Sequence, residues 1–538
     1  SCDISGIQDY IYTISGTKAL RSLRARSLYL ELLLENILDD LLYRLNLSRC
    51  NLLYTGGGHG YLLLPNTDQT KDIIEDFEKE LKSWFLKEFN ISLYIASGYT
   101  HCNSEELSKN IGQVYERVGK KVAVKKTQRY TTDDILFLNT MVRQQEDREC
   151  IECNRTGSIN EEKRCRICQA LIEISPEVTR EDTYFVVSGI SEENLPRATL
   201  PLPFNRALGI KTKQEALKDN YIRIYSKNQP SVGLDLATNL WVGDYSVRSN
   251  NKYGTKDFEE LAHEAQGIKR IAVLRADVDN LGQAFISGFK SKDAHYETIS
   301  RTSTLSRQLS MFFKFYVNHV LKDKNRNAII IYSGGDDMFI VGSWNEVIDL
   351  AGEINAAFNK YTQGTLTISA GIGIYNHSYP ISRIALEAGE LENAAKTKDE
   401  KKNKVTLFRK AKLDERGNAV EEDWILGWER LPMLDSVDTN GLEHPTPVSG
   451  IEDKLLTLRK VFRRDSEHGK AFLYKILELL RQSNKDSINI ARYAYLLQRA
   501  QEKNPSLDVT KFYQYIKDPR ERKELEIAVT LYSYETRK

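Results

Sequence analysis

The sequence lacks a strong net charge and a long hydrophobic run, and most of it lacks cysteine. Its 538 residues carry 76 basic and 75 acidic side chains, so the net charge is +1 and any nucleic-acid contact must come from local patches. No apolar run approaches the roughly 20 residues that a membrane helix needs, so we expect neither a membrane segment nor a secretory signal. With 41% hydrophobic and 28% charged residues, the composition is that of a globular protein. The length predicts several domains.

The cysteines are few and unevenly distributed. Three of the seven are scattered, at Cys2, Cys50 and Cys102. The other four lie in the segment CIECNRTGSINEEKRCRIC, as Cys150, Cys153, Cys165 and Cys168. Two C-x-x-C pairs joined by a short polar loop are typical of a zinc ribbon, and an all-sulfur ligand set makes Zn²⁺ structural, because no coordination position stays open. Redox pairs or disulfides are the alternative, but the scattered free thiols favour a reducing, cytoplasmic environment.

Two adjacent aspartates occupy the tip of an otherwise hydrophobic hairpin, IIIYSGGDDMFIVG, at residues 329–342. The flanking β-branched, aromatic and bulky residues predict two strands. Gly334 and Gly335 permit the turn and the close approach of a ligand to the backbone. Asp336 and Asp337 repel each other, and a divalent cation is the usual compensation. The alternative is an acidic turn without a metal.

The segment around this hairpin repeats a pattern found at the start of the chain. From residue 268 onward the order is strand, helix, hairpin, helix, strand, helix and strand, which predicts a ferredoxin-like palm whose first strand ends on Asp277 and Asp279. The opening segment has Asp3 where the later copy has Asp277, but its hairpin tip reads Gly-Gly-Gly-His at residues 56–59. Because only one copy keeps the acidic tip, a metal site at Asp277, Asp336 and Asp337 is favoured over simple turn chemistry.

The predicted fold class is α+β, with two ferredoxin-like palm domains of the nucleotide-cyclase and polymerase type. We expect a first palm with a degenerate hairpin over residues 1–130 and a linker domain with the four-cysteine zinc site over 131–267. A second palm with the GGDD hairpin should span 268–425, and a C-terminal helical bundle 426–538. The chain starts at Ser1, without an initiating Met, and enters a strand pattern at once, so we expect that an upstream part has been removed.

Six features, in this order, resemble the large palm-domain subunit of type III-A CRISPR effector complexes, the Csm type. They are DISGIQ, GGGH, the four-cysteine insertion, ADVDNLG, SGGDD and the helical C-terminal region, and together they cover nearly the whole chain. Members of this family usually begin with a histidine–aspartate nuclease domain that cuts single-stranded DNA. No His-Asp dipeptide occurs in this chain, so we expect that domain to be missing and do not expect deoxyribonuclease activity.

The resemblance implies that the second palm joins ATP molecules into cyclic oligoadenylates when target RNA is bound. Asp277, Asp336 and Asp337 would be the catalytic residues and would hold Mg²⁺ or Mn²⁺. Nucleotide-binding roles are expected for Asp279, Asn280, Leu281, Gly282, Gly334, Gly335 and Lys396, and for Gly57 and Gly58 of the first palm near a second ATP. For Lys396 a solvated lysine at a helix end is the alternative. The implied partners are the repeat-tag-binding subunit, the small helical subunit, guide crRNA and target RNA, in the cytoplasm and without a membrane.

Two other functions stay open. A diguanylate cyclase also has a hairpin with two glycines followed by acids. However, Asn280, Leu281 and Gly282, with Phe285, occupy the positions where that family has an aromatic–lysine pair and an asparagine that binds guanine, so the sequence gives little support for GTP as the substrate. A catalytically silent scaffold would bind the guide-RNA complex through the zinc insertion and the helical bundle. The intact pair of hairpin aspartates favours the enzyme over the scaffold.

Overall fold

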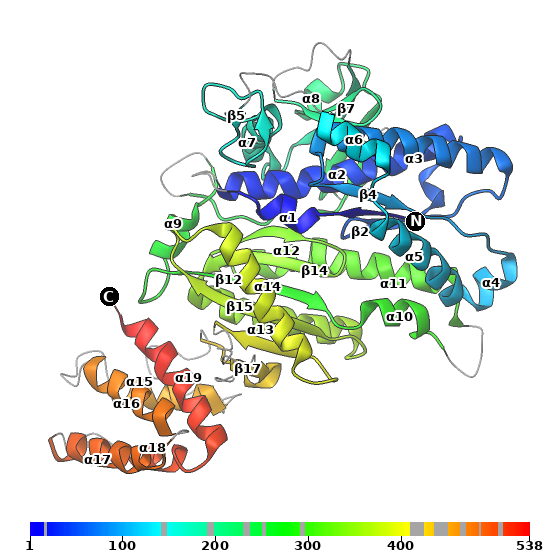
Figure 1. The fold of residues 1–538 in the computed structure, drawn as a ribbon. Coiled ribbons are helices and arrows are strands. Elements are labelled where there is room, and N and C mark those ends of the chain that lie inside the picture. Colours follow the sequence, from blue (N-terminus) through cyan, green and yellow to red (C-terminus); the bar gives the residue numbers. More distant parts are fainter. Residues whose placement is uncertain are drawn as a thin grey trace.

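The computed structural model describes residues 1–14, 19–140, 148–190, 198–229, 237–249, 254–290, 296–408, 424–434, 450–462, 470–483, 486–503 and 509–537. Helices and sheets are mixed along the chain, which confirms the α+β prediction at that level. The first palm, drawn in blue in Figure 1, lies against the second palm, drawn in green to yellow, and the C-terminal helices in orange to red extend from the second palm. No described helix combines the length and the hydropathy needed to cross a lipid bilayer.

The first sheet has four antiparallel strands in the order β2-β3-β1-β4. The strands are β1 (Cys2–Ser5), β2 (Leu52–Gly56), β3 (His59–Leu62) and β4 (Tyr94–Ser97). The helices of this palm are α1 (Ile7–Tyr12), α2 (Ala19–Arg44), α3 (Asp68–Phe89), α4 (Ser104–Lys109) and α5 (Ile111–Thr127). This strand order is the one that a β-α-β-β-α-β chain adopts when its hairpin pairs beside the first strand.

The second sheet repeats that order as β13-β14-β12-β15 and adds β16 and β17 at its edge. Its strands are β12 (Ile271–Val278), β13 (Ala328–Ser333), β14 (Asp337–Ser343), β15 (Ile368–Tyr375), β16 (Lys404–Leu407) and β17 (Trp424–Gly427). Its helices are α10 (Leu281–Ser287), α11 (Ile299–Met311), α12 (Val317–Asp323), α13 (Trp344–Thr362) and α14 (Ile381–Thr397), with a π-helical turn at Phe312–Tyr316. The repeat read from the sequence therefore corresponds to two sheets of like topology.

The two palms pack face to face through a shared hydrophobic core. Ile271 and Val273 of β12 lie in one core cluster with Leu30 and Leu34 of α2, whereas Ala272 and its alternate neighbours face the core that contains α13. Tyr12 contacts Phe339 across this interface, with 4.8 Å between the ring centroids. Side chains alternate between the faces of a strand, so each odd-numbered residue of β12 is directed toward the first palm.

The region between the palms contains a cysteine-rich segment and a second small sheet. The cysteine segment comprises β5 (Arg148–Glu149), β6 (Thr156–Gly157) and α7 (Arg166–Val178). The sheet has the order β11-β10-β7-β9-β8, formed by β7 (Tyr184–Gly189), β8 (Leu200–Leu202), β9 (Arg206–Lys211), β10 (Arg223–Lys227) and β11 (Ala237–Leu240). Three further helices are α6 (Thr132–Thr140), α8 (Lys213–Ala216) and α9 (Phe258–His263).

The C-terminal helices continue the core of the second palm. They are α15 (Gly450–Val461), α16 (Lys470–Ser483), α17 (Ile488–Lys503), α18 (Thr510–Tyr515) and α19 (Pro519–Thr536). Trp344 of α13 contacts Tyr534 of α19 edge to face, and Leu455 of α15 belongs to the same buried cluster. The proposed boundary at 425/426 falls inside β17, which pairs with β16. A cut there would remove part of a strand and open the core.

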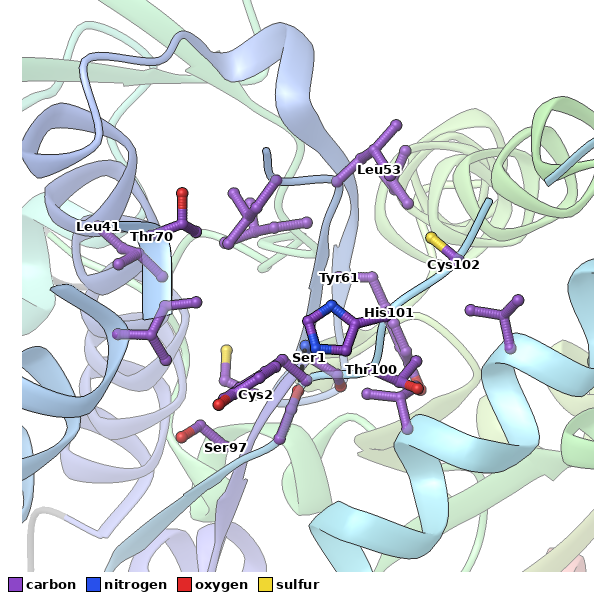
Figure 2. Close-up of a pocket in the computed structure, with 18 of the residues that line it drawn as sticks. Ser1, Cys2, Leu41, Leu53, Tyr61, Thr70, Ser97, Thr100, His101 and Cys102 are labelled. Atoms are coloured by element: carbon purple, nitrogen blue, oxygen red, sulfur yellow. Dashed lines mark hydrogen bonds between the residues drawn. The ribbon is translucent and has the colours of Figure 1, made fainter. Parts of the chain in front are cut away.

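An apolar cavity of about 190 Å³ lies in the first palm (Figure 2). Leu41 of α2, Thr70 of α3 and Leu53 and Tyr61 of the hairpin line it, together with Cys102. None of the three aspartates predicted to bind metal lies among its lining residues. The cavity is therefore separate from the site predicted by the sequence.

Candidate functional site

The acidic hairpin and the end of β12 bring the predicted carboxylates to one end of the second sheet. Asp277 of β12 is paired in register with Asp337 of β14, so the two residues are neighbours across the strands. The Gly334 amide donates a hydrogen bond of 2.8 Å to the Asp337 carbonyl, which closes the turn that carries Asp336. Asp277 lies on the odd-numbered face of β12 that is directed toward the first palm. The alternation of β12 and the tight turn together place all three acids at the interface between the palms.

Burial raises the pKa of each of these acids. Burial raises the pKa of Asp277 to about 6, although the positive charge of Lys396 opposes this shift. Burial and the neighbouring charges of Asp336 and Asp277 raise the pKa of Asp337 well above its ordinary value, and a hydrogen bond with Tyr332 only partly opposes them. Burial also raises the pKa of Asp336, and the charge of His59 counters it. The site therefore has more negative charge than its own cations neutralise.

A divalent cation fits this arrangement chemically. Asp337 Oδ1 is buried and accepts no hydrogen bond within the part of the chain that the structure describes. Buried carboxylate oxygens without donors, crowded by like charges, are suitable ligands for Mg²⁺. The three aspartates do not meet as closely as the cysteines do, because the cysteine set is the one group of described residues whose ligand atoms all lie within 4.8 Å of one another. Binding of a cation would thus have to draw the carboxylates together.

Lys396, at the end of α14, occupies the position of a cation beside Asp277. Its Nζ lies 2.8 Å from Asp277 Oδ1 and 2.7 Å from Glu392 Oε1. Burial alone would lower the pKa of Lys396, but the charges of Glu392 and Asp277 outweigh it and raise the pKa. The lysine is therefore a bound, charged group of the site and not a solvated residue at a helix end.

The segment after β12 places the remaining predicted residues of the second palm. Asp279 is buried, and its Oδ2 accepts hydrogen bonds from Thr367 Oγ1, Ser369 Oγ and the Asn403 amide, at 2.8, 3.1 and 3.0 Å. Asn280 has a left-handed backbone with φ 55° and accepts a 2.7 Å hydrogen bond from Lys402. Leu281 begins α10, and the space beside Gly282 is open. Asp279 thus anchors the chain, whereas Asn280 and Gly282 border open space.

The hairpin tip of the first palm has the same arrangement as that of the second palm, but its one carboxylate, Asp3, is already paired with basic side chains. Asp3 is paired in register with His59, as Asp277 is with Asp337. Asp3 Oδ2 lies 2.6 Å from His59 Nδ1 and 2.5 Å from Lys126 Nζ, so Lys126 stands at Asp3 as Lys396 does at Asp277. Burial alone would raise the pKa of Asp3, but the contacts with His59 and Lys126 outweigh it and hold this pKa below its ordinary value. This tip has no need of a metal ion to balance its carboxylate.

The two tips lie against each other. A Cβ at Gly57, where φ is 59°, would come within 3.1 Å of Asp336 Oδ1, so glycine allows the close approach. The Tyr54 hydroxyl of the first palm lies against Gly335, and the Tyr332 hydroxyl lies beside Gly334. Each tyrosine follows an irregularity in its hairpin register. The matching segments LLYTGG and IIYSGG carry a signal for these two tyrosines, whose place at the site was not predicted.

The four cysteines are gathered into one cluster. All four sulfurs lie within 4.8 Å of one another, and Cys153 Sγ is 3.8 Å from Cys165 Sγ. That separation matches the edge of a tetrahedron whose centre is about 2.3 Å from each sulfur, as for Zn²⁺. Arg26 of α2 donates a 3.4 Å hydrogen bond to Cys168 Sγ and also binds the carbonyls of Tyr10 and Thr13. The cluster fits zinc, and Arg26 joins it to the first palm.

Comparisons with known proteins identify the family. Over 557 residues the chain is 36% identical to the Streptococcus thermophilus CRISPR system single-strand-specific deoxyribonuclease Cas10/Csm1 (subtype III-A), a match that covers 100% of this chain and 68% of the relative. This chain belongs to the Cas10/Csm1 family of subtype III-A. An Enterococcus italicus relative of the same description is 43% identical over 509 residues, which cover 93% of this chain. The chain spans 62% of that relative's length.

Family models and solved structures agree with the membership in the Cas10/Csm1 family. Residues 1–141 match the Csm1 subunit domain B, residues 270–406 the second palm domain of Cas10/Cmr2, and residues 459–538 the second helical domain of the Cmr2 subunit. The fold is similar to that of the Csm1–Csm4 subcomplex of a type III-A interference complex, with a TM-score of 0.74 and 24% identity over 100% of this chain and 69% of that one. The acidic hairpin of this Cas10/Csm1 family member lies within the segment matched as a second palm.

Proposed function

We propose that this chain is the nucleotidyltransferase subunit of an RNA-guided type III-A complex and converts ATP to cyclic oligoadenylates when target RNA is bound. The observation that carries the proposal is the set of three partly buried aspartates beside Lys396, facing a first-palm tip whose own carboxylate is paired with His59 and Lys126. One tip is thus suited to hold a cation and the other to lie beside a second nucleotide.

The proposed reaction joins a 3′-oxygen of one ATP to the α-phosphorus of another, with loss of pyrophosphate and of the proton of the 3′-hydroxyl. Asp277, Asp336 and Asp337 would hold Mg²⁺ or Mn²⁺, which when bound supplies charge neutralisation for the attacking and leaving oxygens. Lys396 would bind phosphate oxygens as a point charge. Gly335 and Gly57 let the two tips approach each other closely, and the exposed Asn280 and the open space beside Gly282 would leave room for phosphates.

Solved structures of related proteins support this assignment. Csm1–Csm4 cassettes of similar fold have been solved with one ATP, with AMPPNP, with pppApA, with pppApApA and with cA4. Such a series holds a substrate, two linear products and a cyclic product of adenylate joining. The curated relatives are described as single-strand-specific deoxyribonucleases, and this activity is not part of our proposal, since no His-Asp dipeptide occurs in the chain.

The proposed partners follow from the same comparisons. The related chains were solved in complex with Csm4. We therefore propose that a Csm4-type subunit is a direct partner and corresponds to the repeat-tag-binding subunit that the sequence resemblance implies. Guide crRNA and target RNA would be bound through the assembled complex. A net charge of +1 agrees with contact through local patches and not through the whole surface.

The proposal is tested with the assembled complex, radiolabelled ATP and Mg²⁺, with and without target RNA. Thin-layer separation should show oligoadenylates that resist phosphatase, as expected for rings without free ends, and only in the presence of target RNA. A complex that is saturated with target RNA and Mg²⁺ and still leaves ATP unchanged would contradict the enzyme and favour the scaffold. Products from GTP in place of ATP would favour the diguanylate cyclase.

The C-terminal bundle is proposed to dock the small helical subunit. The helical pattern of this region predicts exposed aromatic residues at Tyr493 and Tyr495. Tyr493 is fully buried and contacts the Phe512 carbonyl, so the prediction is wrong for this residue, whereas Tyr495 is 62% exposed. Ile488 lies on the same helix and is 50% exposed. The seven-residue spacing puts these two exposed apolar side chains on one face of α17, about two turns apart.

Replacing Ile488 and Tyr495 with serine should weaken co-purification of the small subunit several-fold, because the apolar contact is lost while the buried core is unchanged. Subunit ratios are measured by densitometry of the affinity-purified complex. The matched control replaces the exposed Gln498 and Gln501 of the same helix with serine and should keep full stoichiometry. Full retention of the small subunit by the Ile488 and Tyr495 variant would remove the docking role from this face.

A further inference from the structure

A chain of charged and polar side chains runs from the first palm to the candidate catalytic aspartate. Gln8 of α1 accepts a 2.8 Å hydrogen bond from Arg275 Nη2. Arg275 Nε lies 2.8 Å from Glu392 Oε2, and the other oxygen of Glu392 lies 2.7 Å from Lys396 Nζ. Lys396 in turn contacts Asp277. One oxygen of Glu392 thus binds Arg275, and the other binds Lys396.

Local packing brings these side chains together. Arg275 and Asp277 are two residues apart on β12 and therefore lie on the same face of the strand. Beside Arg275 in the sheet stands Gly371, where a Cβ would come within 2.5 Å of the Glu392 amide, so the glycine lets α14 lie close to the sheet. On α14, a Cβ at Gly389 would come within 2.8 Å of Arg275 Nη1. The missing side chain of Gly371 leaves space for the backbone of α14, and that of Gly389 leaves space for the guanidinium of Arg275.

We propose that Glu392 and Arg275 are positioning residues that hold Lys396 for the phosphates of the nucleotide, and that Gln8 links their arrangement to the first palm. This inference rests on the proposed function and deepens it. Lys396 has two anionic neighbours, Asp277 and Glu392. When Asp277 binds a cation, Glu392 is the neighbour that keeps Lys396 in the site.

The burial of Glu392 explains why Arg275 is needed. Glu392 is 7% exposed, and a buried carboxylate with a single partner would be poorly compensated. Arg275 supplies a second cation, and its rigid guanidinium directs Nε toward Glu392 while the other two nitrogens bind the neighbouring groups. Arg275 Nη1 also lies 3.4 Å from the Ala385 carbonyl, so the guanidinium spans β12, α14 and α1. A displacement of α1 would therefore reach Lys396 through two ion pairs.

The test uses the assembled complex and two readouts, binding of AMPPNP and steady-state oligoadenylate synthesis. Glu392→Gln keeps the shape of the side chain but removes its charge, so Lys396 is left with Asp277 alone. We expect AMPPNP to bind about tenfold more weakly and the KM for ATP to rise about tenfold, with kcat within about threefold of the parent, since one charge-assisted contact is lost from ground-state binding. Gln8→Ala should give the same pattern at about threefold. Glu390→Gln, an exposed acid on the same helix, is the matched control and should bind as the parent does.

A double-mutant cycle separates positioning from a merely structural role. If Glu392 acts through Lys396, Glu392→Gln should change AMPPNP binding less than twofold when Lys396 is already alanine. A full tenfold loss in that background, or parental binding by Glu392→Gln alone, overturns the inference. A parent complex that binds AMPPNP but makes no oligonucleotide overturns the proposed function alone, because the binding cycle can still be read. A parent complex that does not bind AMPPNP overturns both.

Discussion

Replacing Asp336 and Asp337 with alanine is expected to lower oligoadenylate synthesis by at least about a thousandfold. Nucleotidyl transfer depends on bound cations for charge stabilisation worth several kcal/mol, and each 1.36 kcal/mol of barrier is about a factor of ten in rate. Asp337 holds the buried oxygen without a hydrogen-bond donor, and Asp336 lies at the tip that faces Gly57. The rate is measured with radiolabelled ATP, Mg²⁺ and saturating target RNA.

The same variant should remain folded and should lose its response to Mg²⁺. Burial raises the pKa of both acids in the folded chain, so their charged forms are disfavoured there, and at neutral pH their removal relieves a cost. A cation that binds the folded state alone raises the melting temperature, and this increase should be present in the parent and absent in the variant. The control replaces Glu75 and Asp76, an exposed acidic pair on α3, with alanine. Synthesis within a few-fold of the parent by the Asp336 and Asp337 variant would refute the metal-site assignment.

The hairpin could be read from the sequence because its information is local. Two glycines between β-branched runs determine the turn, and the strand alternation that places Asp277 opposite Asp337 follows from the same short segments. The first palm gave an independent reading of the same pattern, with Asp3 opposite His59. The cysteine cluster was equally local, since the paired C-x-x-C spacing alone is typical of a tetrahedral metal site.

The contacts that tune the site could not be read in this way, because they join segments far apart in the chain. Gln8 and Arg275 are separated by 267 positions and meet only when the palms pack together. Tyr493 was expected to be exposed, but it lies at helical spacing with the buried Leu497 and Ala500, and its hydroxyl contacts the Phe512 carbonyl of α18. Which of several polar residues on α14 faces β12 depended on the close approach at Gly371.

Replacing Cys165 and Cys168 with serine is expected to remove zinc completely and to unfold the segment that the cluster holds. The parent should contain close to one equivalent of zinc by elemental analysis, since four thiolates complete one tetrahedral site. Strands β5 and β6 are two residues long and exposed to solvent at all but one position, so they have little hydrophobic core of their own. Structural zinc sites contribute about 10–16 kcal/mol of apparent binding free energy, and in such small segments this free energy is the folding free energy.

The consequence should extend to the first palm through Arg26. Without an ordered Cys168, Arg26 loses its sulfur acceptor and is left with the Tyr10 and Thr13 carbonyls at the end of α1. We therefore expect a lower melting temperature and protease cleavage between residues 148 and 166. The matched control replaces Cys50 and Cys102, which lie outside the cluster, with serine and should keep zinc and stability. A parent that contains no zinc when kept reduced, and forms a disulfide between Cys153 and Cys165 instead, would show that the cluster is a redox site and that its stability comes from covalent pairing.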